Sequence, residues 1–114
     1  MTRFAFTNVT LFDGKGKSAP DQIVLWEGNR IVHAGPAKGA SLGEFSVAAK
    51  GGTVLPGLID AHVHISVEPS MTGISDVADE SLARSAMRAA NNAAALLDAG
   101  ITSARDLGSR DGVA

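Results

Sequence analysis

Two histidines separated by one residue close an apolar segment, and this pattern constrains the fold more than any other feature of the 114-residue sequence. The segment reads Leu-Pro-Gly-Leu-Ile-Asp-Ala-His-Val-His over residues 55–64. Side chains two residues apart on a β-strand point to the same face, so a strand here would bring His62 and His64 together. Neutral imidazole is a common ligand of divalent transition metals, and two converging rings supply half of a four-coordinate site. On spacing alone, two hydrogen-bonded interior histidines that hold no metal remain an equally good interpretation.

The same alternation separates the polar and apolar residues of this segment. Asp60 shares a face with His62 and His64, and three polar groups inside a sheet or barrel are costly unless something satisfies them. A metal ion at the C-terminal end of the strand would do so. Asp60 lies deeper, and we expect it to orient neighbouring groups rather than to bind the metal. The opposite face, which can pack under a helix, carries Ile59, Ala61, Val63 and Ile65.

The residues before Pro56 predict a small β-sheet unit. Strands are expected over residues 4–12, 22–26, 31–34 and 45–49, from their β-branched and aromatic content and the turn residues between them. Gly28 and Asn29 can both take the positive φ angles of a two-residue hairpin turn. His33 lies on this hairpin, and we expect it to be an ordinary surface residue.

The residues after Pro56 predict a strand, a helix and a second strand. Residues 58–65 are nearly all apolar, as in a strand buried on both faces of a parallel sheet. An alanine-rich helix is expected over residues 76–99, capped by Ser75 or Asp76 and followed by Gly100. A strand over residues 101–107 would complete a βαβ unit with parallel strands. The expected apolar stripe of the helix comprises Leu82, Ala86, Ala89, Ala90, Ala93 and Leu97.

Composition excludes several classes of function. The net charge of −2 gives no basic excess for nucleic-acid binding, and the absence of cysteine removes disulfides and thiolate ligands. No stretch of the expected helix approaches the roughly 20 apolar residues of a membrane span. We therefore expect a soluble, cytoplasmic protein.

Four segments together resemble the amidohydrolase superfamily. Pro-Gly-Leu-Ile-Asp-Ala-His-Val-His at residues 56–64 resembles its first barrel strand, and residues 8–14 and 28–35 resemble its N-terminal β-domain. Gly-Ile-Thr-Ser-Ala-Arg-Asp-Leu-Gly at residues 100–108 is similar to the second barrel strand of the imidazolonepropionase-like and prolidase-like branch. The segments occur in the family's order and span nearly the whole chain.

The resemblance implies an α/β fold: the start of a (β/α)8 TIM barrel, preceded by a small β-sandwich. Residues 1–56 would be the N-terminal part of the sandwich, and residues 57–114 the first βαβ unit of the barrel. His62 and His64 would be ligands of one or two divalent metal ions, with zinc expected. The other ligands and the acid/base residue are expected beyond Ala114, because a complete barrel takes about 250 residues. The chain alone, as a fragment, is expected to be inactive.

The activity that the resemblance implies is hydrolysis of a C–N bond by a metal-activated water. The substrate would be a small molecule or dipeptide-like compound with an amide, peptide-like or cyclic amide bond. The partner expected for this segment is the remainder of the barrel, and the full-length protein is expected to be a homo-oligomer. Asp106, at the end of the second strand, would contact the ligands or the substrate; a solvated ion pair with Arg105 is the alternative.

Two other classes of function remain open from the sequence. The first is a non-catalytic scaffold or assembly protein that keeps the amidohydrolase fold, although such relatives usually lose the histidines that are intact here. The second is a free-standing β-domain used for binding, in which the segment after Pro56 has no evident role.

Overall fold

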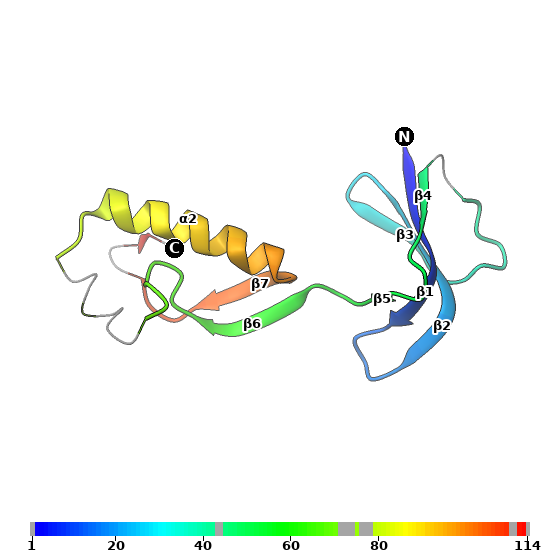
Figure 1. Cartoon of the computed structure of the whole chain (residues 1–114), viewed down its shortest axis with the longest axis horizontal. Helices are drawn as coiled ribbons and strands as arrows, with labels where there is room; N and C mark the ends of the chain where they lie inside the picture. The colour runs from blue at the N-terminus through cyan, green and yellow to red at the C-terminus, as the bar shows by residue number, and fades with distance from the viewer. Residues whose placement is uncertain (1, 43–44, 71–74, 76–78, 110–111, 114) are drawn as a thin grey trace. The chain divides into compact units, whose positions relative to one another are not determined.

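The structure is a computed structural model that describes residues 2–42, 45–70, 75, 79–109 and 112–113. The chain divides into two compact units, Met1–Pro56 and Gly57–Ala114. Each unit has its own β-sheet (Figure 1).

The first unit is a five-stranded sheet with the order β3-β2-β1-β4, in which β5 also pairs with β1. Its strands are β1 (Arg3–Phe12), β2 (Ser18–Glu27), β3 (Arg30–Pro36), β4 (Phe45–Ala48) and β5 (Thr53–Val54). The pairs β1–β2 and β2–β3 are antiparallel, whereas β4 and β5 run parallel to β1. The expected strands are present, and β5 is a strand that the sequence did not predict.

The turn between β2 and β3 needs a positive φ at one central residue, whereas a positive φ was expected at both. Glu27 pairs with Arg30, so Gly28 and Asn29 form a two-residue hairpin turn, as predicted. Gly28 has a φ of +56°, but Asn29 is not among the residues with positive φ. The prediction for Asn29 was wrong, because one class of two-residue hairpin turn needs positive φ only at its first central position.

The two faces of this sheet differ in how well they are covered. Ala5, Ile23 and Leu25 form a buried cluster, against which Ala40 packs from the loop after β3. On the alternate positions the rings of Phe4 and Trp26 stack with centroids 5.6 Å apart. Phe4 also stacks on Phe45, whose residue surface is 57% exposed. Among the described residues, the aromatic face is therefore only partly covered.

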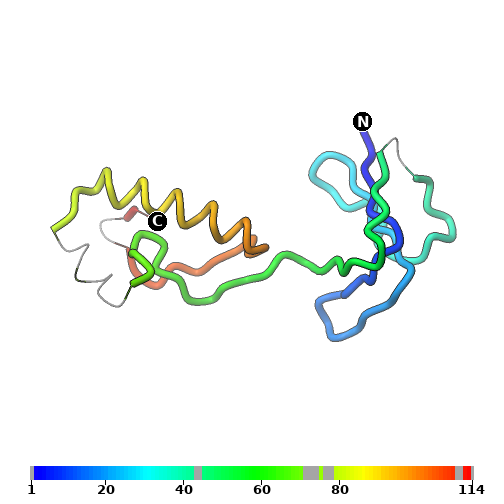
Figure 2. Tube along the Cα trace, viewed as in Figure 1, coloured from blue at the N-terminus to red at the C-terminus, as the bar shows by residue number. Residues whose placement is uncertain are grey.

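The second unit has the strand–helix–strand order that the sequence predicted. It consists of β6 (Leu58–Val63), α2 (Leu82–Asp98) and β7 (Ile101–Asp106). The two strands are parallel and pair from Leu58–Ile101 to Val63–Asp106, with α2 lying alongside them (Figure 2). Their carboxyl ends therefore lie at the same edge of the sheet.

The helix begins later than predicted. Ser81, with φ −69° and ψ 145°, is the N-cap, and its hydroxyl oxygen accepts a hydrogen bond from the Arg84 N–H. Ser75 is therefore not the cap of this helix, and Asp76, the other predicted cap, lies outside the described residues. The C-terminus matches the prediction, since Gly100 follows the end of the helix with a φ of +84°. No helix in the described part of the chain is long and apolar enough to span a membrane.

The buried face of α2 also differs from the predicted apolar stripe. Ser85 and Ala89 are buried, whereas Leu82 and Leu97 are 46% and 62% exposed. The residues half-buried beside them are Arg88, Asn92, Ala93 and Leu96. The inward face of the helix is therefore half polar, and two of its leucines remain in solvent.

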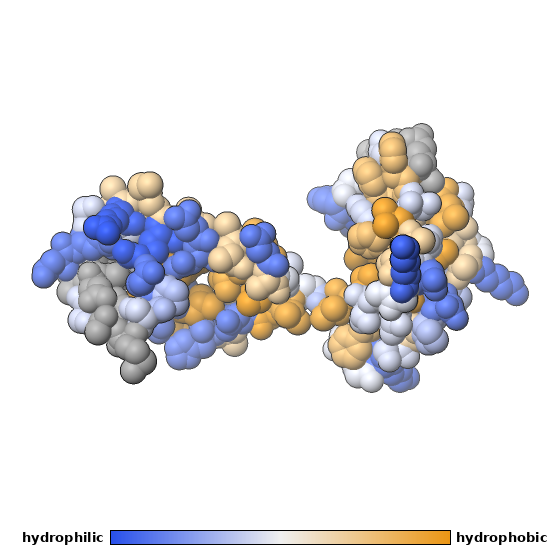
Figure 3. Space-filling view, viewed as in Figure 1, coloured by the Kyte–Doolittle hydropathy of each residue, from blue (hydrophilic) through white to orange (hydrophobic). Residues whose placement is uncertain are grey.

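The sequence predicted that the first strand of the second unit, β6, is buried on both faces. In the structure it is not. Ile59 is 75% exposed and Leu58 is 48% exposed. Figure 3 shows hydrophobic side chains at the surface over β6 and β7, whereas hydrophilic ones gather over the N-terminal half of α2. The reason is that β6 has β7 as its only neighbouring strand among the described residues, and one helix cannot cover both faces.

The start of β6 admits no side chain at Gly57. A Cβ atom built there would lie 2.0 Å from the Oγ1 atom of Thr102 and 2.7 Å from its Cβ. Rotation about χ1 moves the hydroxyl but not the Cβ atom, so the backbone itself would have to shift.

Substituting Gly57 by alanine is therefore expected to lower the free energy of unfolding by about 1–3 kcal/mol, the usual cost of overpacking. Urea unfolding of the variant and of the unmodified protein measures this loss. The double variant Gly57→Ala/Thr102→Gly is the control, and the alanine should cost much less in that background. An equal cost with and without the Thr102 side chain would refute the steric explanation.

Candidate metal centre

His62 and His64 lie next to each other at the carboxyl end of β6. Their ring centroids are 5.3 Å apart, and the ring planes are inclined at 74°. His62 belongs to the strand and His64 follows its last residue, Val63. Both residues are exposed in the described chain. The structure thus brings together the two imidazoles that the sequence singled out.

A hydrogen bond fixes the orientation and the tautomer of His64. Its Nδ1 atom lies 3.1 Å from the carbonyl oxygen of Gly108, in the loop after β7. A carbonyl oxygen can only accept, so Nδ1 carries the proton and the lone pair of the neutral ring lies on Nε2. Metal-binding histidines characteristically donate their other ring N–H to such an acceptor.

Asp60 acts on the backbone of the same strand. Its Oδ1 atom accepts a hydrogen bond of 3.0 Å from the N–H of His62. The described contacts of Asp60 therefore support the position of His62 through the main chain.

Asp106 joins the loops that follow the two strands. Its Oδ2 atom accepts a hydrogen bond of 2.9 Å from the Ile65 N–H, and its Oδ1 atom accepts one of 2.7 Å from the Gly108 N–H. Ile65 directly follows the candidate ligand His64, and the carbonyl of Gly108 binds the ring of His64. The Asp106 carboxylate is thus bound by main-chain donors, and no ion pair joins it to Arg105 among the described residues.

The donor set fits half of a metal site. Two imidazoles at the end of one strand, one with its tautomer fixed, are suitable nitrogen ligands for a divalent ion. No group of three or more histidine, cysteine, aspartate or glutamate residues suited to a metal occurs in the described part of the chain. A complete coordination shell therefore needs donors in addition to these two.

The third histidine, His33, is far from His62 and His64 in sequence and belongs to the other unit. His33 is on β3 of the first unit, where its Nε2 atom lies 3.0 Å from the Pro36 carbonyl oxygen. It is half-buried rather than fully exposed. Its described contact is local to the hairpin.

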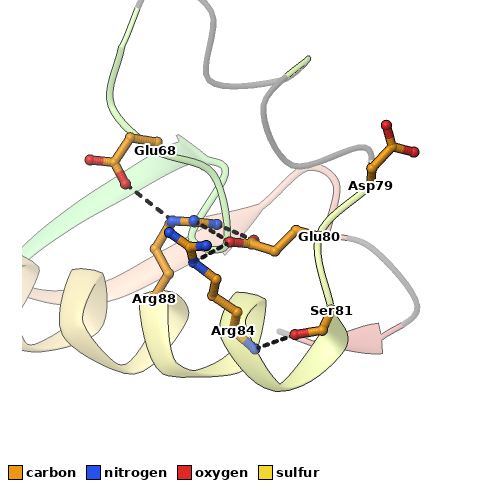
Figure 4. Close-up of a pocket in the computed structure, with 6 residues that line it drawn as sticks. All are labelled: Glu68, Asp79, Glu80, Ser81, Arg84 and Arg88. Atoms are coloured by element: carbon orange, nitrogen blue, oxygen red, sulfur yellow. Dashed lines mark hydrogen bonds and ion pairs between the residues drawn. The ribbon is translucent and has the colours of Figure 1, made fainter.

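A cluster of charged residues near the start of α2 was not predicted from the sequence. These residues line an open pocket of about 560 Å³ (Figure 4). Arg88 lies at its centre and forms two hydrogen bonds of 2.5 Å to the Glu80 carboxylate, and Arg84 binds the same carboxylate at 3.1 Å. The pocket is lined by Glu68, Asp79, Glu80, Ser81, Arg84 and Arg88. The spacing of Glu80, Arg84 and Arg88 at four-residue intervals is the sequence signal that could have indicated this cluster.

The ion pair between Glu80 and Arg88 shifts the pKa values of both side chains in the expected directions. The hydrogen bond from Arg88 lowers the pKa of the Glu80 carboxyl below its ordinary value of 4.5, against the opposing effect of burial. The same hydrogen bond raises the pKa of Arg88. Only 7% of the Glu80 side chain and 16% of the Arg88 side chain are exposed, so the pair is a fixed part of the structure.

Comparison with known proteins identifies the family. The profile of the Amidohydrolase family matches residues 53–113, which is more than half of the chain and includes both histidines. The chain belongs to the amidohydrolase family.

Individual relatives agree with this assignment. An imidazolonepropionase of Micrococcus luteus is 37% identical over 57 residues, which cover 50% of this chain and 14% of that protein. The crystal structure of an amidohydrolase matches 96% of the chain with a TM-score of 0.80 and 29% identity. A prolidase complexed with N-methylphosphonate-L-proline matches 97% of it, with a TM-score of 0.78 and 27% identity. The chain spans 26% and 27% of those two structures, so it corresponds to about a quarter of the solved amidohydrolase-fold chains that it matches.

The lowered pKa of Glu80 predicts a pH dependence of stability. Above pH 4.5, the ordinary pKa of the group, the Glu80 carboxylate of the folded state is charged and paired with Arg88. Its contribution to the free energy of unfolding is then fully present. The contribution is lost as the pH falls through the lowered pKa of the folded state. Thermal unfolding of the unmodified protein and of Glu80→Gln, measured from neutral pH into the acid range, should therefore show midpoints that converge in acid. A difference between the midpoints that stays constant throughout would contradict this account.

Proposed function

We propose that this chain forms the N-terminal part of a metal-dependent amidohydrolase in which His62 and His64 bind the metal. The observation that carries the proposal is the adjacency of the two rings, 5.3 Å apart, together with the Gly108 carbonyl that leaves Nε2 of His64 free. Two further ligands would come from other strands of the full-length protein.

The proposed fold of the full-length protein is a (β/α)8 barrel with a small β-sandwich. Residues 57–114 would supply the first βαβ unit, and residues 1–56 would supply part of the sandwich. The parallel pairing of β6 with β7 and the exposure of Ile59 support this proposal, because a barrel strand has a neighbour on each side and a covered face. The open aromatic face around Phe4 and Phe45 similarly suits a second layer of a sandwich.

The proposed reaction is hydrolysis of a C–N bond. A divalent ion held by His62 and His64 would supply Lewis-acid polarisation of the substrate carbonyl and would activate water for attack. His62 and His64 would bind the metal ion, while Asp60 and Asp106 hold the backbone that carries the two histidines. Proton transfer to the leaving nitrogen would fall to a residue of the later strands.

The relatives suggest two substrate classes for this reaction. One is an imidazolonepropionase, and another is a prolidase complexed with N-methylphosphonate-L-proline. We accordingly propose a small substrate with a cyclic amide or a dipeptide bond, and zinc as the metal in one or two copies. The intact histidine pair favours this activity over a non-catalytic member of the family.

Removal of the metal and of its ligands tests the proposal in the full-length protein. Treatment with a chelator should abolish hydrolysis of proline dipeptides or cyclic amides, and added zinc or manganese should restore it. His62→Ala and His64→Ala should each weaken zinc binding by more than about 100-fold, beyond the loss typical of residues that only support a ligand. Zinc affinity is measured by competition with a coloured chelator.

His33→Ala is the matched control, because it removes an imidazole from the first unit. It should leave zinc affinity and turnover unchanged. Turnover that survives metal removal, or zinc affinity that is insensitive to both ligand variants, would refute the proposal. The absence of any hydrolysis in the metal-loaded protein would favour a non-catalytic scaffold.

A further inference from the structure

The face that α2 turns inward carries polar residues beside the apolar ones that would be expected there. Arg88 and Asn92 are half-buried on it, one turn apart, while Leu82 and Leu97 of the same helix are exposed. Helical packing against a sheet normally buries the apolar stripe. The polar face therefore requires partners, and these lie in the loop that follows His64.

Asn92 binds the main chain immediately after the candidate ligand. Its Nδ2 group donates to the carbonyl oxygen of Ile65 at 2.7 Å and to that of Val67 at 3.1 Å. Ile65 is the residue next to His64, so one amide group fixes the carbonyls on both sides of Ser66. Ser66 is itself 3% exposed.

Arg88 holds the residue between those two carbonyls. Its Nη1 atom donates to the Ser66 carbonyl oxygen at 3.2 Å, and its Nε atom donates to Glu68 at 3.1 Å. The two 2.5 Å hydrogen bonds to Glu80 keep the guanidinium in place, as Figure 4 shows. Three consecutive carbonyls after His64 are therefore bound by side chains of one helix.

The other side of the same loop is bound by β7 and the residues after it. Asp106 accepts from the Ile65 N–H, and Gly108 accepts from the ring of His64. The main chain after His64 is thus held between a donor pair on α2 and an acceptor on β7.

We propose that Asn92 and Arg88 are positioning residues for His64: they hold the Ile65–Val67 backbone and thereby aim the Nε2 atom of the ligand. This inference rests on the proposed metal site. Neither residue touches the metal, and each acts through main-chain carbonyls. The consequence is that metal affinity depends on a helix face that carries none of the ligands.

The sharpest variant is Asn92→Asp in the full-length protein. It keeps the shape of the side chain, removes both N–H donors and places a carboxylate against two carbonyls. Asn91→Asp is the matched control, since it makes the same change at the adjacent, exposed position. Arg88→Lys is a second variant, which keeps the charge that Glu80 pairs with but has too few donors in the right places to bind Ser66 as well.

Two readouts separate positioning from stability alone. The first is zinc affinity by chelator competition, at a temperature where each apo-protein is folded by circular dichroism. The second is the visible absorption of the cobalt-loaded protein, which responds to the geometry of the ligands. Asn92→Asp should weaken zinc binding by about 10-fold, the lower end of the range for residues that support a ligand, and should shift the cobalt bands.

Arg88→Lys should change both readouts in the same direction by a smaller amount, and Asn91→Asp should change neither. Zinc affinity and cobalt spectra of Asn92→Asp and Arg88→Lys that match those of Asn91→Asp would overturn the inference. In that case a loss of zinc binding in His64→Ala would show that the proposed metal site still stands. Unchanged zinc binding in His64→Ala would instead overturn the proposed site itself.

Discussion

The parallel pairing of β6 with β7 is the constraint on which the rest of the second unit depends. Parallel strands must be joined by a crossover, and here the crossover contains α2. The pairing places the carboxyl ends of both strands at one edge. Residues that lie 44 positions apart in sequence, His64 and Gly108, can therefore share a hydrogen bond.

The polar face of α2 follows from the same arrangement. The loop that leaves β6 passes the middle of the helix, where Arg88 and Asn92 lie, and the carbonyls of Ile65–Val67 bind side chains rather than a strand. A buried polar group without a partner costs about 1–3 kcal/mol, so carbonyls in this position need donors. Arg88 and Asn92 supply them, and Glu80 compensates the guanidinium charge. The helix thus gives up part of an apolar contact to satisfy the loop next to the candidate ligands.

The sequence was sufficient for the histidine pair and for the elements other than β5 and the start of α2, because these features depend on local periodicity. Alternation along β6 correctly placed His62 beside His64, and Gly100 correctly marked the end of α2. The inward face of α2 was predicted only in part. Ala89 and Ala93 face inward as expected, but the polar residues beside them were missed because hydrophobic periodicity assumes that the apolar stripe meets the sheet. The roles of Asp106 and Gly108 involve main-chain partners far away in sequence, which no spacing rule reveals. The burial of β6 was mispredicted because, among the described residues, β7 is its only neighbouring strand and α2 covers one face of the pair.

The second unit therefore contains two kinds of surface with different requirements. At the carboxyl edge, the polar groups around His64 are satisfied by hydrogen bonds within the unit itself, so this half of the site is ordered by local contacts. Along the strands, Leu58 and Ile59 remain exposed. They contribute hydrophobic stabilisation only when another layer of the protein covers them. In the proposed barrel, metal binding and burial of the strands would favour the same event, because the further ligands and the covering layers would both come from other parts of the full-length protein. The free energy of metal binding would in this way contribute to closing the fold around a site whose first two ligands are already in position.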